Sequence, residues 1–305
     1  MLSPLILQSF ITIFLVVGTG VFVGWRRIIL PDHTKAISRL ILYVLLPCLI
    51  FANLTSGTAL HSLKDSYHAL FLGMIMVVIG YGAGFIYAYF MKWDKARKRL
   101  FVVMCSHGNS LLLALPIAHL YFGEGSVLSV ILYDLGTQFI FWSLGITVIT
   151  SHLKSNPFRV FFNPNFIAFL ISTPIVLIGL AVPVFVLNAS QYLGQAVLGL
   201  GLLLMGTVLW EMRDSFKAGL FNSFLLSHML IKLIALPLIA IAIVHLFDVS
   251  SMLGKVLVLQ AAMPSVVNLL IVAQEYDLDS QSVAMGILVT SVLSLVTIPL
   301  FLMAV

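Results

Sequence analysis

Runs of about 20 apolar residues follow one another along the whole chain, and this repetition limits its fold more than any other feature. A helix of that length crosses the hydrocarbon core of a bilayer, about 30 Å thick. It also satisfies every backbone hydrogen-bonding group internally, as lipid requires. The runs predict an all-α integral membrane protein with ten spans, near 4–25, 37–56, 67–91, 101–122, 126–150, 164–187, 191–210, 223–247, 253–275 and 281–304.

Composition supports the same class. The 305 residues are 61% hydrophobic and 9% charged, whereas a soluble globular protein carries about 25% charged residues. The net charge of +5 comes from basic residues in short clusters between the runs, so no nucleic-acid partner is predicted. Cys48 and Cys105 lie inside apolar runs, which excludes a disulfide framework and a metal-ligand spacing.

The positions of Lys and Arg predict the orientation of the spans. Thirteen of the 16 lie at one side: Arg26, Arg27, Lys35, Arg39, Lys92, Lys95, Arg97, Lys98, Arg99, Lys154, Arg159, Arg213 and Lys217. The other side has only Lys64 and Lys255. The positive-inside rule then places both termini outside the cytoplasm of a bacterial plasma membrane. The alternative is that one span is miscounted and the bias is accidental.

The first apolar run is retained as a span, because no basic residue precedes it and Arg26 and Arg27 follow it, the reverse of a signal peptide. With five spans in each half, the halves would enter the membrane from opposite sides, as an inverted repeat requires. The first span opens SPLILQSF and the sixth NPNFIAFL, and the fourth and ninth each carry a proline in mid-membrane.

These two prolines, Pro116 and Pro264, predict interrupted helices. An interior proline costs a helix about 3 kcal/mol. A simple kink is the alternative, but paired breaks in inverted halves, each near an Asn, point to a substrate site. The freed N–H groups attract anions, and Pro116 suits the first turn of a half-helix. The predicted substrate-binding residues are Asn109, Ser110, Pro116, Pro264, Ser265 and Asn268.

Asp134 and Gln138 lie one turn apart in the fifth span and share a helix face. An ionisable group at membrane depth indicates function by default, so Asp134 is predicted to be a proton or cation site, or a brace for the unwound fourth span. The alternative is a carboxylate in a water-filled vestibule. Gln260, one turn before Pro264, joins this supporting set.

Two histidines flank the break in the fourth span. His107 and His119 would titrate near neutral pH and are candidates for ion coupling, with a satisfied core histidine as the alternative. Lys232, inside the eighth span, is predicted to reach the membrane interface with its long side chain. Asn53, Glu211, His228, His245 and Glu275 lie near span ends and are interpreted as interfacial.

No catalytic motif is present. The sequence has no G-x-S-x-G elbow, no H-E-x-x-H helix and no phosphate loop of the Walker type. The chain is therefore not predicted to be an enzyme, and neither a cofactor nor a metal is expected.

The interrupted helices carry a family resemblance. The segments GNSLLLALPIAHLYFG and LQAAMPSVVNLLIVAQEYDLD resemble the two crossover motifs of the auxin efflux carrier family. Further matches lie in LILYVLLPCLIFANL, NPNFIAFL, KLIALPLIA and TSVLSLVTIPL, which are similar to the second, sixth, eighth and tenth spans of that family. The resemblance covers nearly the whole chain.

The resemblance implies a ten-helix crossover fold, similar to bile-acid symporters and sodium/proton antiporters. It implies scaffold segments at 1–66 and 151–215, mobile segments at 67–150 and 216–305, an elevator motion and a homodimer. By position, Asn109 matches a substrate-contacting residue, Pro116 and Pro264 the crossover prolines, and Gln138 a residue of the supporting site.

Two departures narrow the expected substrate. Residues 151–163 form a short loop where plant exporters have a long segment, so the chain resembles the prokaryotic members. Asn268 stands where the plant proteins tend to have proline. The expected substrates are small organic anions such as malonate and malate, rather than auxin itself. The alternatives are a proton- or sodium-coupled carrier of the same fold, and a membrane sensor or scaffold without flux.

Overall fold

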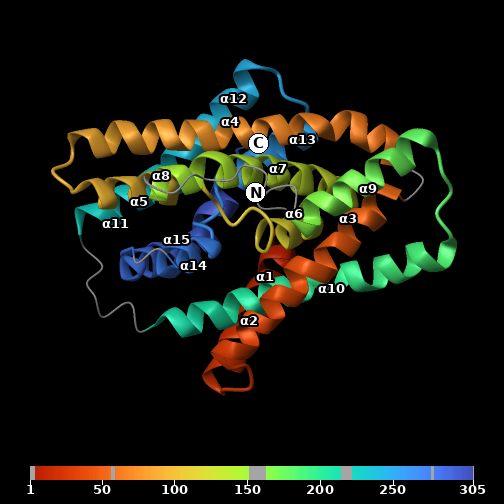
Figure 1. Ribbon diagram of the computed structural model, residues 1–305, viewed down its shortest axis with the longest axis horizontal. Coiled ribbons are helices and arrows are strands. Elements are labelled where there is room, and N and C mark those ends of the chain that lie inside the picture. Colours follow the sequence, from red (N-terminus) through yellow and green to blue (C-terminus); the bar gives the residue numbers. More distant parts are fainter. Residues whose placement is uncertain (1–3, 56–58, 151–162, 214–221, 276–277, 305) are drawn as a thin grey trace. The chain divides into compact units, whose positions relative to one another are not determined.

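A computed structural model describes residues 4–55, 59–150, 163–213, 222–275 and 278–304 (Figure 1). All regular elements in these ranges are helical. In chain order they are α1 (Pro4–Trp25), α2 (Pro31–Leu40), η1 (Ile41–Leu45), α3 (Leu46–Thr55), α4 (Ala59–Phe90), α5 (Lys95–Ser106), α6 (Ala114–Phe122), η2 (Glu124–Ser126), α7 (Val127–Ile140), η3 (Phe141–Gly145), α8 (Ile146–Thr150), α9 (Pro164–Ile178), α10 (Val184–Glu211), α11 (Ser223–Leu230), η6 (Ile231–Ala235), α12 (Leu236–Leu246), α13 (Ser251–Ala261), α14 (Asn268–Glu275) and α15 (Ser280–Leu302).

Six helices within the described ranges are long and apolar enough to cross a membrane: Pro31–Thr55, Ser66–Phe90, Glu124–Ile149, Val184–Glu211, Ser223–Leu246 and Ser280–Leu302. Shorter apolar helices lie at Ile11–Trp25, Pro164–Ile178 and Ser251–Ala261. The prediction of an all-helical membrane protein is confirmed at this level. The inverted repeat of ten spans stays a prediction.

The chain forms two compact units. The first comprises Met1–Leu70, Leu111–Leu135 and Phe158–Glu211. Within it α1 packs along α10, and α3 packs against both α9 and α10. Gly20 on α1 and Gly206 on α10 mark the closest approach, because a Cβ on either would overlap backbone atoms of the other helix. Small residues of this kind let membrane helices pack closely without a hydrophobic driving force.

The second unit comprises Phe71–Ser110, Gly136–Pro157 and Met212–Val305. Within it α5 contacts α8 and α11, and α15 contacts α11, α13, α14 and η6. An aromatic cluster joins the beginning of α5 to α11: the ring centroids of Trp93, Phe101 and Phe224 lie 5.1–5.2 Å apart. This cluster and the contacts of α15 give the unit its core.

Two of the apolar runs are interrupted in the way that the prolines predicted. In the run near 101–122, α5 ends at Ser106 and α6 begins at Ala114. In the run near 253–275, α13 ends at Ala261 and α14 begins at Asn268. The first break starts well before Pro116, which lies in the first turn of α6.

Two further prolines lie in helices that remain continuous, and a π-helical turn precedes each of them. A π-helical turn, η1, comes directly before the helix that carries Pro47, and η6 comes directly before the helix that carries Pro237. A proline lacks the N–H that would bond to residue i−4, and its ring clashes with that carbonyl. A π turn opens the preceding backbone, and such turns are frequent at functional sites.

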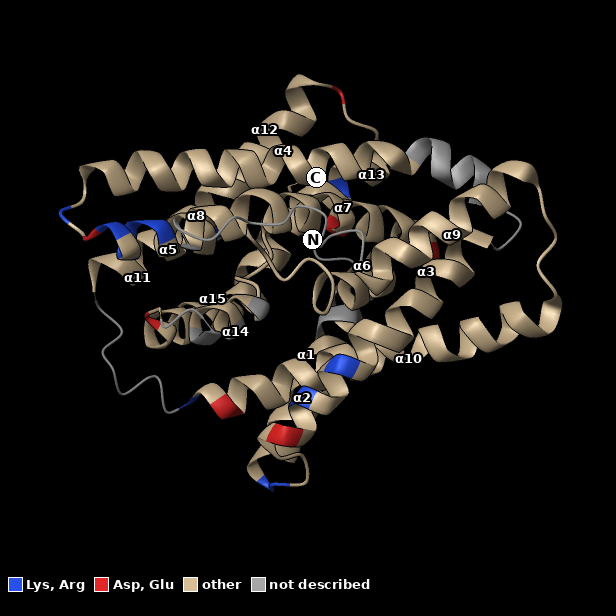
Figure 2. Cartoon of the chain, viewed as in Figure 1, with Lys and Arg blue, Asp and Glu red and all other residues tan. Residues whose placement is uncertain are grey.

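Charged residues are confined to a few places in the described chain. Figure 2 shows blue and red at the turn between α4 and α5 and around α2, while most helices are tan along their length. At that turn Asp94 caps α5 by accepting a hydrogen bond from the amide of Arg97 at 2.9 Å. Lys154, Arg159 and Lys217, which entered the orientation argument, lie outside the described residues. The orientation stays a prediction.

Candidate functional site

Two non-helical segments of the second unit, one after α5 and one after α13, are joined through their backbones. Gly108 and Ser265 form an isolated antiparallel β-bridge. The amide of Asn109 donates to the carbonyl of Pro264 at 2.7 Å, and the amide of Val266 donates to the carbonyl of His107 at 3.3 Å. Residues 107–109 and 264–266 are called the crossing below. These bonds satisfy backbone groups that the breaks would otherwise leave unpaired in an apolar environment.

Gly108 allows the two backbones to come this close. A Cβ built on it would lie 3.1 Å from the Cβ of Met263 and 3.1 Å from Nζ of Lys232. Before it, His107 leaves the helix with extended backbone angles of φ −98° and ψ 125°. On the other side, Pro264 cannot continue α13 because it has no N–H to donate. The local sequence therefore explains both sides of the crossing.

Gln260 connects α13 to the non-helical segment that follows α5. Its Nε2 donates to the carbonyl of Ser110 at 3.0 Å. Its Oε1 is buried and has no hydrogen-bond partner among the described residues. The structure therefore brings together two pairs of predicted site residues, Asn109 with Pro264 and Ser110 with Gln260.

Ser265 is held from three directions. Its amide donates to Oγ1 of Thr290 at 3.2 Å, its hydroxyl faces the carbonyl of Met104 at 3.4 Å, and Oγ lies 2.8 Å from Nε2 of His228. The thiol of Cys105 lies 3.6 Å from Nδ1 of the same imidazole. One assignment of protons fits every contact: the thiol donates to Nδ1, Nε2 donates to Oγ, and the hydroxyl donates to the carbonyl.

His107 is a buried histidine with its own partner. Its Nε2 lies 2.8 Å from the hydroxyl of Tyr81, and its ring meets Phe141 edge to face at 4.9 Å between centroids. These contacts agree with the alternative of a satisfied core histidine. A role in ion coupling stays a prediction.

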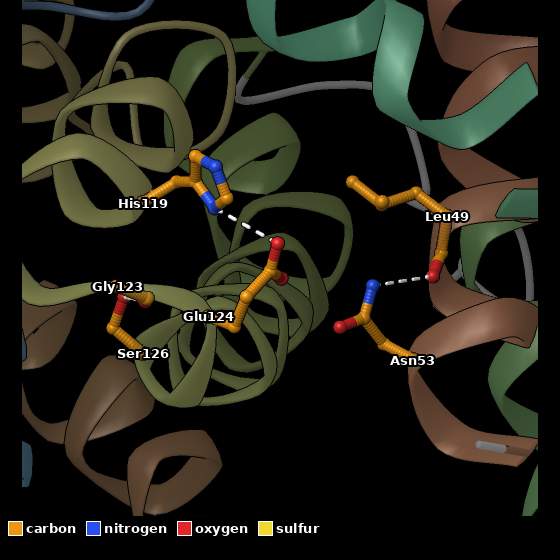
Figure 3. A network of polar contacts seen from close by, with 6 residues as sticks. All are labelled: Leu49, Asn53, His119, Gly123, Glu124 and Ser126. Atoms are coloured by element: carbon orange, nitrogen blue, oxygen red, sulfur yellow. Dashed lines mark hydrogen bonds and ion pairs between the residues drawn. The ribbon is translucent and has the colours of Figure 1, made fainter. Parts of the chain in front are cut away.

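His119 lies in the first unit, in the last turn of α6. Figure 3 shows its imidazole facing Glu124, with 3.6 Å between Nδ1 and Oε1. That separation is too long for a hydrogen bond, and the Glu124 side chain is 77% exposed. The contact is a weak one at an exposed carboxylate. In the same view Asn53 donates from Nδ2 to the carbonyl of Leu49 at 2.9 Å.

The other predicted residues are described separately. Pro116 belongs to the first unit, as does Asp134, whose side chain is only 2% exposed on α7. Gln138 follows one turn later and is half-buried. Asn268 begins α14, but its side chain lies outside the described residues.

Two predictions from the sequence are wrong. Lys232 does not reach an interface: the side chain is 2% exposed and lies in η6. His228 is not interfacial either, since it is fully buried between α5 and Ser265. Both errors came from judging exposure by distance from the span ends. Exposure depends instead on the neighbouring helices, and η6 packs against α5 and α15.

One feature of the sequence would have indicated that both residues are buried. His228 and Lys232 are four residues apart in the apolar segment SHMLIKLIALP, so they lie on one helix face. Two ionisable side chains on one face of a spanning helix indicate a polar interior face rather than a lipid-facing one.

Known sequences match the chain over nearly its whole length. The model of the family described as "Membrane transport protein" matches residues 5–158 and 150–302. An uncharacterized transporter of Methanocaldococcus jannaschii is 26% identical over 304 residues, covering 95% of each chain. An uncharacterized transporter of Methanothermobacter thermautotrophicus is 25% identical over 303 residues, covering 96% of each chain.

Proposed function

Since the chain belongs to the membrane transport protein family, which is the family of the auxin efflux carriers, we propose that it is a secondary transporter of small organic anions. The resemblance drawn from the sequence is confirmed by this membership. Membership establishes a multi-pass membrane protein that transports a solute. The solute class and the binding site are our proposal.

The observation that carries the proposal is the crossing. Two helices interrupted in mid-run meet there, held by the bridge between Gly108 and Ser265 and by the hydrogen bond from Asn109 to Pro264. New helices, α6 and α14, begin after the two non-helical segments. The first amides of α14 are bonded to preceding carbonyls, Leu269 to Val266 and Leu270 to Val267. The positive end of each helix dipole nevertheless favours a carboxylate near these helix starts. The proposed substrate-binding residues are Asn109, Ser110, Pro116, Pro264, Ser265 and Asn268.

We propose that transport is an elevator motion. Residues 67–150 and 216–305 would move with the crossing, and residues 1–66 and 151–215 would form the fixed scaffold of a homodimer. The glycine contact between α1 and α10 supports a rigid scaffold, because a close backbone contact resists rearrangement. The loop charges support termini outside the cytoplasm of a bacterial plasma membrane.

A second candidate is a cation-coupled carrier of the same fold. It is favoured by Asp134, an ionisable side chain buried at membrane depth. In this mechanism Asp134 would bind a proton or sodium ion, with Gln138 beside it on the same helix.

Reconstitution into liposomes tests both candidates. Radiolabelled malonate is offered under a voltage, a pH gradient or a sodium gradient. Uptake that follows voltage alone supports a uniporter, and uptake that follows an ion gradient and is uncoupled in Asp134→Asn supports the coupled carrier. Asn109→Ala should abolish saturable uptake while the protein is still produced and folded. Flux of neutral or cationic solutes with no carboxylate flux would refute the anion proposal, and no flux of any solute would favour a sensor.

A further inference from the structure

Lys232 is a cation buried next to the crossing. Its side chain is 2% exposed, and Nζ lies 3.1 Å from the position that a Cβ of Gly108 would take. Gly108 is the residue that pairs with Ser265. The ammonium is thus placed where the two interrupted helices meet.

This ammonium has no counter-charge in the described part of the chain. No described acidic residue forms an ion pair with it, and no described residue accepts a hydrogen bond from it. An isolated buried charge is strongly unfavourable, and buried charges are normally paired. A lysine at membrane depth therefore indicates a function whose partner is not part of the described chain.

The imidazoles beside Lys232 already have hydrogen-bond partners. Two histidines lie near Lys232: His107 directly precedes Gly108, and His228 lies one turn before Lys232. However, the Nε2 atoms of both imidazoles are taken by Tyr81 and Ser265, and Cys105 contacts Nδ1 of His228. The three N–H donors of the ammonium remain available for a ligand.

Lys232 lies in a π-helical turn and is buried there. Pro237 follows five residues after Lys232, and the π turn η6 that precedes it includes Lys232. Such turns are frequent at functional sites. The turn contacts α5 and α15, while Ile234 on the same turn is exposed.

We propose that the Lys232 ammonium binds the carboxylate of the transported anion and is the residue that selects negative charge. This inference rests on the proposed function. It assigns the main charge recognition to η6, whereas the sequence had assigned it to the helix N-termini alone. The ligand class is a small mono- or dicarboxylate, because the ammonium offers a positive charge and three N–H donors.

The test compares purified wild-type protein with Lys232→Met, which keeps the length of the side chain and removes the charge. Malonate binding is measured by calorimetry and by the thermal shift that malonate produces. We expect Lys232→Met to bind malonate at least about tenfold more weakly, since a charge-assisted hydrogen bond is lost. Lys95→Met removes a charge from the exposed beginning of α5 and should bind like wild type.

The ligand-free proteins give a second readout. If the ammonium is an uncompensated buried charge, Lys232→Met without malonate should melt at or above the temperature of wild type. A variant that melts lower and still binds malonate with wild-type affinity would show a structural lysine and would overturn the inference alone. A wild-type protein that responds to no carboxylate, with malate and acetate as the other probes, would overturn the proposed function as well.

Discussion

Gly108→Ala tests whether the crossing needs two backbones in close contact. The added methyl group would lie 3.1 Å from Cβ of Met263, a rigid atom next to the backbone, and 3.1 Å from the mobile end of Lys232. The ammonium can move away. The Cβ of Met263 can move only if the backbone around Met263 and Pro264 moves as well. Overpacking of this kind costs about 1–3 kcal/mol. We expect that loss in the free energy of unfolding, together with reduced malonate uptake.

Gly82→Ala is the matched control. Gly82 lies on α4 in the same unit, and nothing lies within 4 Å of the Cβ it would gain. Alanine is favoured over glycine inside a helix by roughly 0.5–1 kcal/mol, so this variant should be as stable as wild type or more stable. The free energy of unfolding of both variants is measured by titration with a denaturing detergent in mixed micelles. Their activity is measured as malonate uptake into liposomes. Equal stability and uptake in the two variants would refute the close contact.

Two further substitutions test the hydrogen bonds around the crossing. Gln260→Ala leaves the carbonyl of Ser110 without its donor at 3.0 Å, and we expect a loss of about 1–3 kcal/mol in the free energy of unfolding by the same measurement; no loss would mean that water replaces the amide. Tyr81→Phe removes the hydroxyl that lies 2.8 Å from Nε2 of His107. We expect it to lower the free energy of unfolding by about 1–3 kcal/mol and to leave malonate binding intact. Loss of malonate binding at unchanged stability would instead indicate that His107 takes part in transport.

The two breaks were predictable because proline has a local effect. Pro116 and Pro264 each remove a backbone donor, and that holds whatever surrounds the helix. The extent of the first break was not predictable in the same way. It begins at His107, before any proline, because Gly108 pairs with Ser265 from a distant part of the chain. A contact between segments more than 150 residues apart leaves no trace in a local pattern.

Burial was the weaker part of the prediction. The sequence left Asp134 between a buried site and a water-filled vestibule, and the side chain is 2% exposed. It placed Lys232 and His228 at interfaces, although both are buried. Hydropathy identifies which segments lie in a membrane, but the face that a helix turns inward is set by its neighbours. For η6 those neighbours are α5 and α15.

The backbone bonds at the crossing also limit how the protein can change shape. Asn109 donates from the first link to the second, and Val266 donates from the second to the first. Neither segment can shift alone without breaking one of these hydrogen bonds. In apolar surroundings no water is available to replace the lost bond. We therefore expect residues 107–109 and 264–266 to move together whenever the protein changes conformation.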